Sequence, residues 1–227
     1  MPATPRSRPG GQGLVTSTTA LTDDELGSSA QRDRRRRMLD ATITLATKGG
    51  YDAVQMRAVA ENADVALGTL YRYFPSKIHL LVSGLAREFE RAQEKIDRVD
   101  LPGDAPSERL LFVLGRVTRM LQRYPELTEA MTRAFMFADA SAAAEVDTVG
   151  RLMEQMFARA IEPGVEPSPQ NVAIARVIGD VWLSQLVAWV TRRASISDVT
   201  ARLELTVHLL LDHAEATTRQ QARPVSG

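Results

Sequence analysis

The sequence contains no cysteine among its 227 residues, and aromatic residues make up only 5% of it. The absence of cysteine excludes disulfide bonds, thiolate metal sites and a catalytic thiol, and it fits a reducing cytoplasm. We find no apolar run close to the ~20 residues that a membrane-spanning helix needs, and no apolar core of a secretory signal peptide. The sequence therefore predicts a cytoplasmic protein that has no membrane partner.

The chain also lacks a net charge, because 28 Lys and Arg residues balance 28 Asp and Glu residues. The two signs are nevertheless unevenly distributed. Residues 1–77 hold 11 basic and 8 acidic residues, a net charge of +3, and residues 78–227 carry the opposite net charge of −3. A basic N-terminal part on an acidic remainder is typical of a protein that binds nucleic acid, although the asymmetry here is small.

The sequence carries no motif of a catalytic or metal site. The histidines His79, His208 and His213 form no i,i+4 pair and have no accompanying carboxylate pattern. A G-x-S-x-G motif, a phosphate-binding loop and a G-x-G-x-x-G motif are all missing. We therefore expect no enzymatic activity, no cofactor and no metal ion, and we interpret the histidines as structural or solvated.

Long segments rich in Ala, Leu, Arg and Glu indicate an all-α protein of nine helices. Gly49-Gly50 is expected to end the first helix, Ser168-Pro169 to begin the eighth and Ser197-Asp198 to begin the ninth. The segment near the N-terminus is rich in Pro, Gly, Ser and Thr and lacks periodicity, which is typical of disorder. The predicted parts are a disordered tail (residues 1–29), a three-helix head (30–77), a six-helix body (78–219) and a flexible tail (220–227).

The most informative stretch is VQMRAVAENADVALGTLYRYFPSK, residues 54–77. It predicts two short helices, Met56–Asn62 and Leu67–Tyr73, which together read as a helix-turn-helix. The break between them falls at Asp64, which we expect to cap the second helix. The next helix, from Ser76 to about residue 98, is expected to link the head to the body.

The second short helix has one buried and one outward face. Leu70 and Phe74 lie four residues apart and therefore share the buried face. The side chains left outside include a hydroxyl, two phenols and a guanidinium, which suit a DNA major groove. Pro75 stops the helix, and the free amides at Ser76 together with Lys77 suit a phosphate. The outward residues are predicted to be Leu67, Gly68, Thr69, Tyr71, Arg72 and Tyr73.

Residues 34–81 resemble the N-terminal domain of TetR-family transcriptional repressors. The family's hallmark is the run V-x-x-G-T-L-Y-x-[HY]-F-x-x-K, and residues 65–77 match it throughout. One position departs from the family pattern, because the first motif helix usually opens with threonine and this chain has Gln55 or Met56 there. The resemblance implies a three-helix head that binds operator DNA and a helical body that binds an effector and a second copy.

The resemblance also implies which residues touch DNA. Arg57, at the start of the first motif helix, is expected to reach a base edge, and Arg72 is expected to add sequence preference. The basic run at the first helix is predicted to touch phosphates or the minor groove, with a merely solvated charge run as the alternative. The residues assigned mainly to the DNA backbone are Thr69, Tyr71, Tyr73 and Lys77, and the basic run contributes Arg34 and Arg35 as DNA-binding residues.

The body has a closer resemblance within the family. The stretches LTEAMTRAFMFADASAAAEVDTV and VWLSQLVAWVTRRAS are similar to actinobacterial TetR-family repressors of cholesterol-catabolism genes. This likeness implies that the effector is a steroid catabolite carried as a coenzyme A thioester. A fatty acyl-CoA or another hydrophobic ligand remains an alternative. A helical acyl-CoA-binding protein or enzyme without specific DNA binding is a more distant one.

Methionine and aromatic residues gather in the middle of the body. By their spacing alone they could form an ordinary bundle core, but flexible methionines beside aromatic rings also line adaptable apolar pockets. The family resemblance favours the pocket. Arg109, Arg116 and Arg123, spaced at seven residues, are candidates for holding the phosphates of the ligand, or else form a solvated face. The predicted lining consists of Met120, Met131, Phe135, Met136, Met153, Phe157, Trp182, Leu186 and Trp189.

The last two predicted helices carry more apolar surface than the outside of a monomer needs. Packing them against a second copy as a four-helix interface would bury this surface, whereas a larger monomer core is the alternative. We therefore predict a homodimer, and a two-fold dimer implies an operator that is an inverted repeat. The predicted interface includes Val181, Gln185, Leu205 and Leu209.

Overall fold

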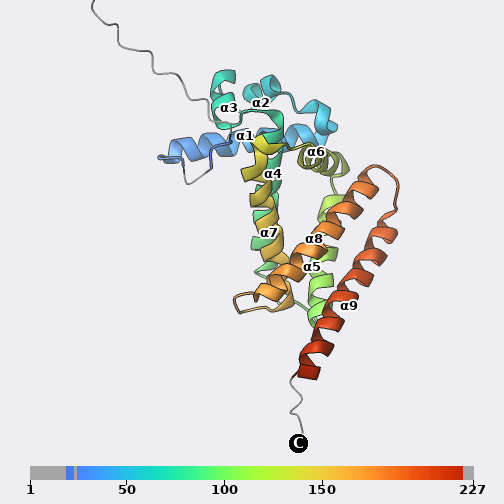
Figure 1. Ribbon diagram of the computed structural model, residues 1–227. Coiled ribbons are helices and arrows are strands. Elements are labelled where there is room, and N and C mark those ends of the chain that lie inside the picture. The colour runs from blue at the N-terminus through green and yellow to red at the C-terminus, as the bar shows by residue number, and fades with distance from the viewer. Residues whose placement is uncertain (1–18, 23–24, 222–227) are drawn as a thin grey trace, which may run out of the picture.

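The computed structural model describes residues 19–22 and 25–221, with the side chains of residues 213–221 excepted. The predicted all-α fold is confirmed within this part of the chain, which contains nine α-helices and one short 3₁₀ helix (Figure 1). The helices are α1 (Ser29–Ala53), α2 (Met56–Asn62), α3 (Leu67–Tyr73), α4 (Lys77–Ile96), α5 (Pro106–Gln122), α6 (Pro125–Met136), η1 (Ala140–Ala142), α7 (Ala143–Ile161), α8 (Pro169–Val190) and α9 (Ile196–Gln221).

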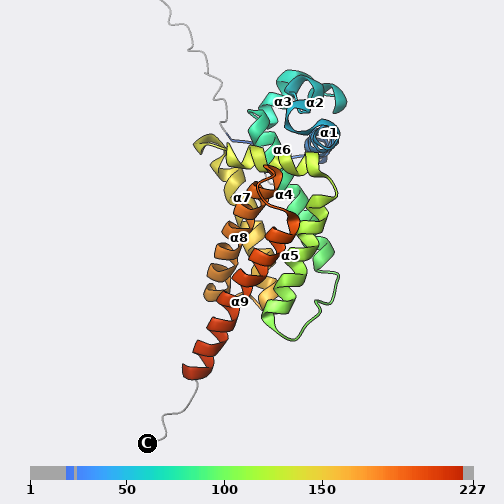
Figure 2. The ribbon, with the colours of Figure 1, turned by 90° about the vertical axis from the view of Figure 1, so that its right-hand side faces the viewer.

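Helices α1, α2 and α3 form the head at one end of the molecule, and α4 runs from the head into the body (Figure 1). Helices α5, α7, α8 and α9 extend along the body, whereas α6 crosses the end of the body that faces the head (Figure 2). Because α6 packs against both α1 and α4, it supports the head and forms part of the body at once.

The first helix begins and breaks where local chemistry requires. The Ser28 hydroxyl accepts the Gln31 N–H, and the Gln31 side chain accepts the Ser28 N–H, so the two residues form a capping box. The helix is interrupted at Gly49 and at Gly50, whose φ of 63° favours glycine. This break lies where the sequence predicted the end of the first helix.

The predicted cap at Asp64 is wrong, whereas the predicted start of the ninth helix at Ser197-Asp198 is correct to within one residue. Asp64 adopts a left-handed φ of 52° inside the turn, and the N-cap position of α3 is Ala66, which offers no side-chain acceptor. Ser195 caps α9, because its Oγ accepts the Asp198 N–H while Asp198 Oδ2 accepts the Ser195 N–H. These hydrogen bonds from Ser195 lower the pKa of Asp198 below its ordinary value.

The expectation of a disordered tail over residues 1–29 is wrong where the structure describes it. Ala20 and Leu26 are buried, and residues 25–28 lead directly into the cap of α1. Residues 1–18 and 23–24 lie outside the described part of the chain. At the other end, α9 continues through residues 220 and 221, and residues 222–227 lie outside the described part.

The core of the body is organised around Trp182 of α8, which is 2% exposed. Its ring makes edge-to-face contacts with Phe89 of α4 and Phe157 of α7, each with a centroid separation of 6.0 Å. The indole Nε1–H donates to Thr118 Oγ1 of α5 at 3.2 Å. Helices α4, α5, α7 and α8 therefore meet at the side chain of Trp182, in the core of the body.

One described helix, α8, is long and apolar enough to cross a membrane by length and composition, so the expectation of no such run does not hold there. Arg176 and Asp180 nevertheless lie near its middle, and charged residues are costly in a bilayer core. Arg176 Nε pairs with Glu154 Oε1 of α7 at 2.7 Å. Only 28% of its most apolar window is buried inside the chain, which leaves α8 with a large exposed surface.

Candidate DNA-binding surface and effector cavity

Helix α3 presents a small outward surface. Gly68, Tyr71 and Arg72 are exposed, and Tyr71 keeps 47% of its surface accessible. A β carbon added at Gly68 would meet no heavy atom within 4 Å, so this surface is open to an incoming groove. Leu67 and Thr69 are half-buried at its edge. The predicted outward residues other than Tyr73 therefore do gather on one accessible face.

Tyr73 is a correction. Its side chain is 1% exposed, and its hydroxyl has no hydrogen-bond partner among the described residues. Residues three and four apart share a helix face, so Tyr73 lies on the same inner side as Leu70, which is three residues earlier. Tyr73 cannot contact DNA in this arrangement.

Arg57 is exposed on α2, close to the beginning of that helix. The residue before the helix, Gln55, occupies the N-cap position but makes no side-chain cap hydrogen bond. The departure from the family's threonine therefore removes a cap as well as a hydroxyl that can contact a phosphate. Arg57 has the exposure that a base contact requires, and its role remains a prediction.

Lys77 lies at the start of α4 and is half-buried. Its Nζ sits 3.7 Å from the ring centroid of Tyr51, whose other cationic neighbour, Arg133 of α6, has its guanidinium carbon 4.4 Å from the same centroid. Burial lowers the pKa of Lys77, and the charge of Asp52 opposes this shift. Two cations on one ring tie the beginning of α4, the end of α1 and α6 together.

The amides at the start of α4 are less free than the sequence suggested. Ser76 Oγ accepts the N–H groups of Ile78 at 3.2 Å and His79 at 3.5 Å. His79 is buried, and its ring nitrogens contact Ser76 Oγ and the carbonyl oxygen of Ser141. This histidine is structural, as predicted, and it joins the start of α4 to η1.

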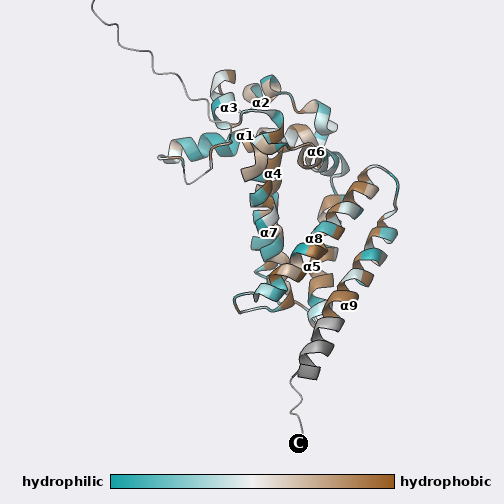
Figure 3. Cartoon of the chain, viewed as in Figure 1, coloured by the Kyte–Doolittle hydropathy of each residue, from teal (hydrophilic) through white to brown (hydrophobic). Residues whose placement is uncertain are grey.

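The basic run lies within α1 rather than ahead of it, and its members differ (Figure 3 shows this end of α1 as hydrophilic). Arg35 Nε donates to the carbonyl oxygen of Leu21 at 2.9 Å, and its guanidinium lies 5.6 Å from the ring centroid of Phe74. The Nε of Arg35 is thus committed to the protein, and the phosphate or minor-groove contact of this half-buried side chain remains a prediction. Arg34 is half-buried, and its phosphate contact remains a prediction.

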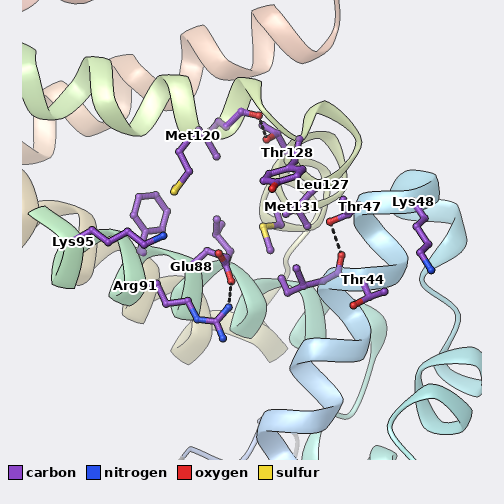
Figure 4. A pocket seen from close by; sticks show the side chains of 15 residues that line it. Thr44, Thr47, Lys48, Glu88, Arg91, Lys95, Met120, Leu127, Thr128 and Met131 are labelled. Atoms are coloured by element: carbon purple, nitrogen blue, oxygen red, sulfur yellow. Dashed lines mark hydrogen bonds and ion pairs between the residues drawn. The ribbon is translucent and has the colours of Figure 1, made fainter.

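The body contains two adjoining cavities, here treated as the outer and the deep part of one site. The outer part has a volume of about 410 Å³ and lies between α1, α4, α5 and α6 (Figure 4). The deep part, lined by α4 to α8 and reaching Trp182, has only about 40 Å³. The two parts share the side chains of Leu85, Phe89, Leu121, Thr128 and Met131.

Six of the nine residues predicted to bind the effector lie at this cavity, and their contact with an effector remains a prediction. Met120 lines the outer part, Met131 lines both, and Phe135, Met153, Trp182 and Leu186 line the deep part. Three residues line neither part: Met136 is 52% exposed, Phe157 packs behind Trp182, and Trp189 is half-buried elsewhere on α8.

Basic residues at the cavity come from places that the sequence did not indicate. Lys48 of α1 lies on one side of the outer part, with Arg91 and Lys95 of α4 on the other (Figure 4). Arg91 is partly neutralised by Glu88, at 2.8 Å. By contrast Arg109, predicted to hold ligand phosphates, donates to backbone carbonyl oxygens that include that of Ile161, at 2.8 Å, and so caps the end of α7.

An apolar surface runs along the outer side of α8 and α9, which pack against each other. Hydrophobic residues recur along both helices (Figure 3). Val177, Leu205 and Leu209 are 46%, 61% and 59% exposed, and Val181 and Gln185 are half-buried beside them. The predicted interface residues therefore lie on an accessible surface, and the dimer remains a prediction.

Similarity to known proteins agrees with this arrangement. Residues 38–83 match the bacterial regulatory proteins of the tetR family, and residues 103–210 match the tetracyclin repressor-like C-terminal domain. The chain is 63% identical over 201 residues to the HTH-type transcriptional repressor KstR of Mycolicibacterium smegmatis, which covers 88% of this chain and 98% of that protein.

Solved structures agree in fold. A TetR transcriptional regulator from Rhodococcus sp. RHA1 is 33% identical, with a TM-score of 0.74 over 81% of this chain and 98% of that one. Thermus thermophilus FadR, in complex with lauroyl-CoA, is 22% identical, with a TM-score of 0.62 over 78% of this chain and 93% of that one. The chain therefore belongs to the TetR family, in which it is a transcriptional repressor similar to KstR and not an enzyme.

Proposed function

We propose that this repressor binds inverted-repeat operator DNA as a homodimer and leaves it when a steroid thioester of coenzyme A binds. Its target genes serve steroid and lipid degradation, and it acts in the cytoplasm. The observation that carries the proposal is the position of the cavity. Helices α1, α4 and α6 line it, and the same three helices form or support the DNA-binding head.

The dimer follows from the apolar surface of α8 and α9. Two copies of this surface packed as a four-helix interface bury Val177, Leu205 and Leu209, which one chain leaves exposed. A two-fold axis through this interface presents two copies of α3 on one side of the dimer. The half-sites of the operator should then be centred a multiple of ~34 Å apart.

The chemistry of the cavity supports an effector with a rigid apolar part and an anionic part. The deep part is lined almost entirely by apolar side chains from five helices, which suits fused rings. Lys48, Arg91 and Lys95 at the outer part provide cations for phosphate groups. A CoA thioester carries both chemistries, and Thermus thermophilus FadR has this fold with lauroyl-CoA bound.

Release of DNA follows from the small volume of the deep part. A space of about 40 Å³ cannot hold a ring system, so an effector whose rings enter it must bind a shape in which the helices around it have moved apart. Burial of ~300 Å² of ring surface contributes about 5–10 kcal/mol to the binding free energy before other costs, and this contribution offsets the free energy needed to open the deep part. The effector therefore selects the open shape, and the closed shape is the one that holds DNA.

The movement reaches the head through α6. Arg133 of α6 lies over the Tyr51 ring at the end of α1, and Lys77 of α4 lies close to the same ring. Met131, two residues before Arg133, lines both parts of the cavity. A displacement of α6 by the effector therefore disturbs the contact that joins α1 to α4, and α4 follows directly after α3, the recognition helix that is expected to enter the DNA groove.

The test is a calorimetric titration of a steroid CoA thioester into the free dimer and into the operator-bound dimer. We expect weaker binding to the operator-bound dimer, by the same factor by which the thioester weakens operator binding. Free coenzyme A should have little effect, because most of the affinity comes from the rings. Equal thioester affinities for the two forms would show that the compound is not the inducer.

A fatty acyl-CoA is the alternative effector, because the outer part of the cavity also admits a flexible chain. The discriminating measurement is operator release by palmitoyl-CoA and by the steroid thioester at matched concentrations. The proposal requires the steroid to act at a concentration at least tenfold lower. Preference for palmitoyl-CoA would assign the chain to fatty-acid control instead.

A further inference from the structure

A short segment before α1 connects the recognition helix to the body. Residues 19–22, here termed the strap, make three hydrogen bonds to distant elements. The Leu21 N–H donates to the carbonyl oxygen of Tyr73 at the end of α3, at 3.0 Å. The Leu21 carbonyl oxygen accepts from Arg35 Nε of α1 at 2.9 Å, and the Ala20 N–H donates to Glu145 Oε1 of α7 at 2.6 Å.

The bond to Glu145 is the only one of the three that joins the strap to the body. Glu145 is 7% exposed, and a buried carboxylate is costly unless it accepts hydrogen bonds. Its Oε1 is satisfied by the strap, whereas Oε2 has no hydrogen-bond partner within the described part of the chain. The contact is thus a charge-assisted hydrogen bond to a carboxylate that is almost fully buried, which makes it stronger than an ordinary surface contact.

Glu145 stands at the beginning of the helix that closes the deep part of the cavity. Val149 and Met153 follow it at intervals of four residues. The three side chains therefore lie one above another, on successive turns along one side of α7. Val149 and Met153 line the deep part. An effector that displaces these two side chains therefore moves the helix on which the strap is anchored.

One side of the strap faces a cleft rather than closely packed side chains. A polar cleft of about 620 Å³ lies between the strap, α1, α4 and α7. On the α4 side, Arg87 has its Nε and Nη2 buried without a hydrogen-bond partner in the described residues. A segment held by a few hydrogen bonds over a cleft belongs to the less stable parts of a fold and can be released without unfolding the rest.

We propose that the strap positions the recognition helix α3 for DNA. When the effector binds, α7 moves, the hydrogen bond between Ala20 and Glu145 breaks and the strap is released. The strap is bonded to the end of α3 at Tyr73 and to Glu145 of α7. Because α7 also lines the deep part of the cavity, the strap connects this part to the DNA-binding surface when no effector is bound. This route is separate from the contact of α6 with Tyr51. The inference rests on the proposed function for its effector, whereas its DNA-positioning half stands without it.

The test uses two full-length variants that remove the two partners of one hydrogen bond. Ala20→Pro removes the N–H donor and Glu145→Ala removes the acceptor. Thr19→Pro is the matched proline control, since the Thr19 amide makes no hydrogen bond within the described residues, and Asp147→Ala is an exposed carboxylate control on α7 at the same cleft. Operator affinity is measured by fluorescence anisotropy at fixed salt, and steroid thioester affinity by calorimetry on the DNA-free dimer.

We expect each of the two variants to weaken operator binding about tenfold and to tighten thioester binding, with both controls unchanged. The double variant should be no worse than either single one, because both remove the same contact. Opposite changes in the two affinities separate this role from a general packing defect, which would weaken both. Unchanged operator affinity in both variants, additive effects, or a parallel loss of both affinities would each overturn the proposal.

The two proposals fail in different measurements. If the thioester does not release operator DNA from the unaltered chain, the proposed effector is wrong. The anisotropy cycle between Ala20→Pro and Glu145→Ala needs no effector, and it still decides whether the strap positions α3. If the thioester releases operator DNA normally but the double-variant cycle shows no coupling between Ala20 and Glu145 in operator affinity, the strap does not position α3.

Discussion

Gly179 of α8 provides the sharpest test of the deep part of the cavity. A β carbon built at this position would lie 2.8 Å from Met153 Cε, which is shorter than the ~3.5–4.0 Å of a normal carbon contact. The terminal methyl of Met153 must therefore move in the Gly179→Ala variant. The free space beside it is the deep part of the cavity, whose volume is about 40 Å³.

We expect the Gly179→Ala variant to change effector affinity but not the free energy of unfolding. Alanine is favoured over glycine inside a helix by ~1 kcal/mol, and forcing Met153 away from its preferred rotamer costs a similar ~0.5–1.5 kcal/mol. The net change in the free energy of unfolding should therefore lie close to zero. The rings of the effector, however, would have to share the deep part with a displaced methionine, and such overpacking costs ~1–3 kcal/mol. We expect thioester binding to weaken about tenfold to a hundredfold, with operator affinity unchanged.

The assay is calorimetry of the steroid thioester with the DNA-free dimer, alongside thermal unfolding. Gly150→Ala on α7 is the matched control, because its added β carbon would meet nothing within 4 Å. It should raise stability by ~1 kcal/mol and leave effector binding unchanged. Combining Gly179→Ala with Met153→Ala restores the space and should recover much of the affinity. If Gly179→Ala alone binds the thioester normally, the rings do not occupy the deep part.

Three further predictions concern the DNA-binding surface. Arg57→Ala should cost ~1–3 kcal/mol on operator DNA and far less on random DNA; equal losses in a competition assay would assign Arg57 to the DNA backbone. Gly68→Ala should stabilise the fold by up to ~1 kcal/mol, because its β carbon meets nothing, yet weaken operator binding; unchanged binding would remove Gly68 from the interface. Tyr73→Phe removes a buried hydroxyl that lacks a partner in the described residues, so the melting temperature should stay or rise by the equivalent of ~1 kcal/mol. A selective loss of operator affinity in Tyr73→Phe would contradict its burial.

Most helix boundaries were predictable because their signals are local. Pro106, Pro125 and Pro169 each stand at the first position of a helix, and Gly49-Gly50 interrupts α1. Proline fits that first position because its missing N–H would have no partner there. The strap could not be predicted, since its composition is typical of disorder and its order depends on Glu145, 125 residues further along the chain from Ala20.

The cavity was predictable in composition but not in detail. Met131 and Phe135 on α6 are four residues apart and share the inner face, whereas Met136 is rotated by about 100° and points outward. Composition alone does not distinguish these faces when apolar residues are adjacent. The basic residues at the outer part were missed for another reason: Lys48 of α1 and Lys95 of α4 meet only after the chain has folded.

The unequal volumes of the two parts of the cavity also bear on the time course of induction. An effector reaches the outer part, of about 410 Å³, by diffusion, but its rings wait for the deep part, of about 40 Å³, to open. Binding that depends on such an opening is slower than a diffusional encounter, and its observed rate levels off as the ligand concentration rises. Under the proposed function, the opening of the deep part therefore limits the rate of induction, and we expect a brief pulse of effector to pass without releasing the DNA.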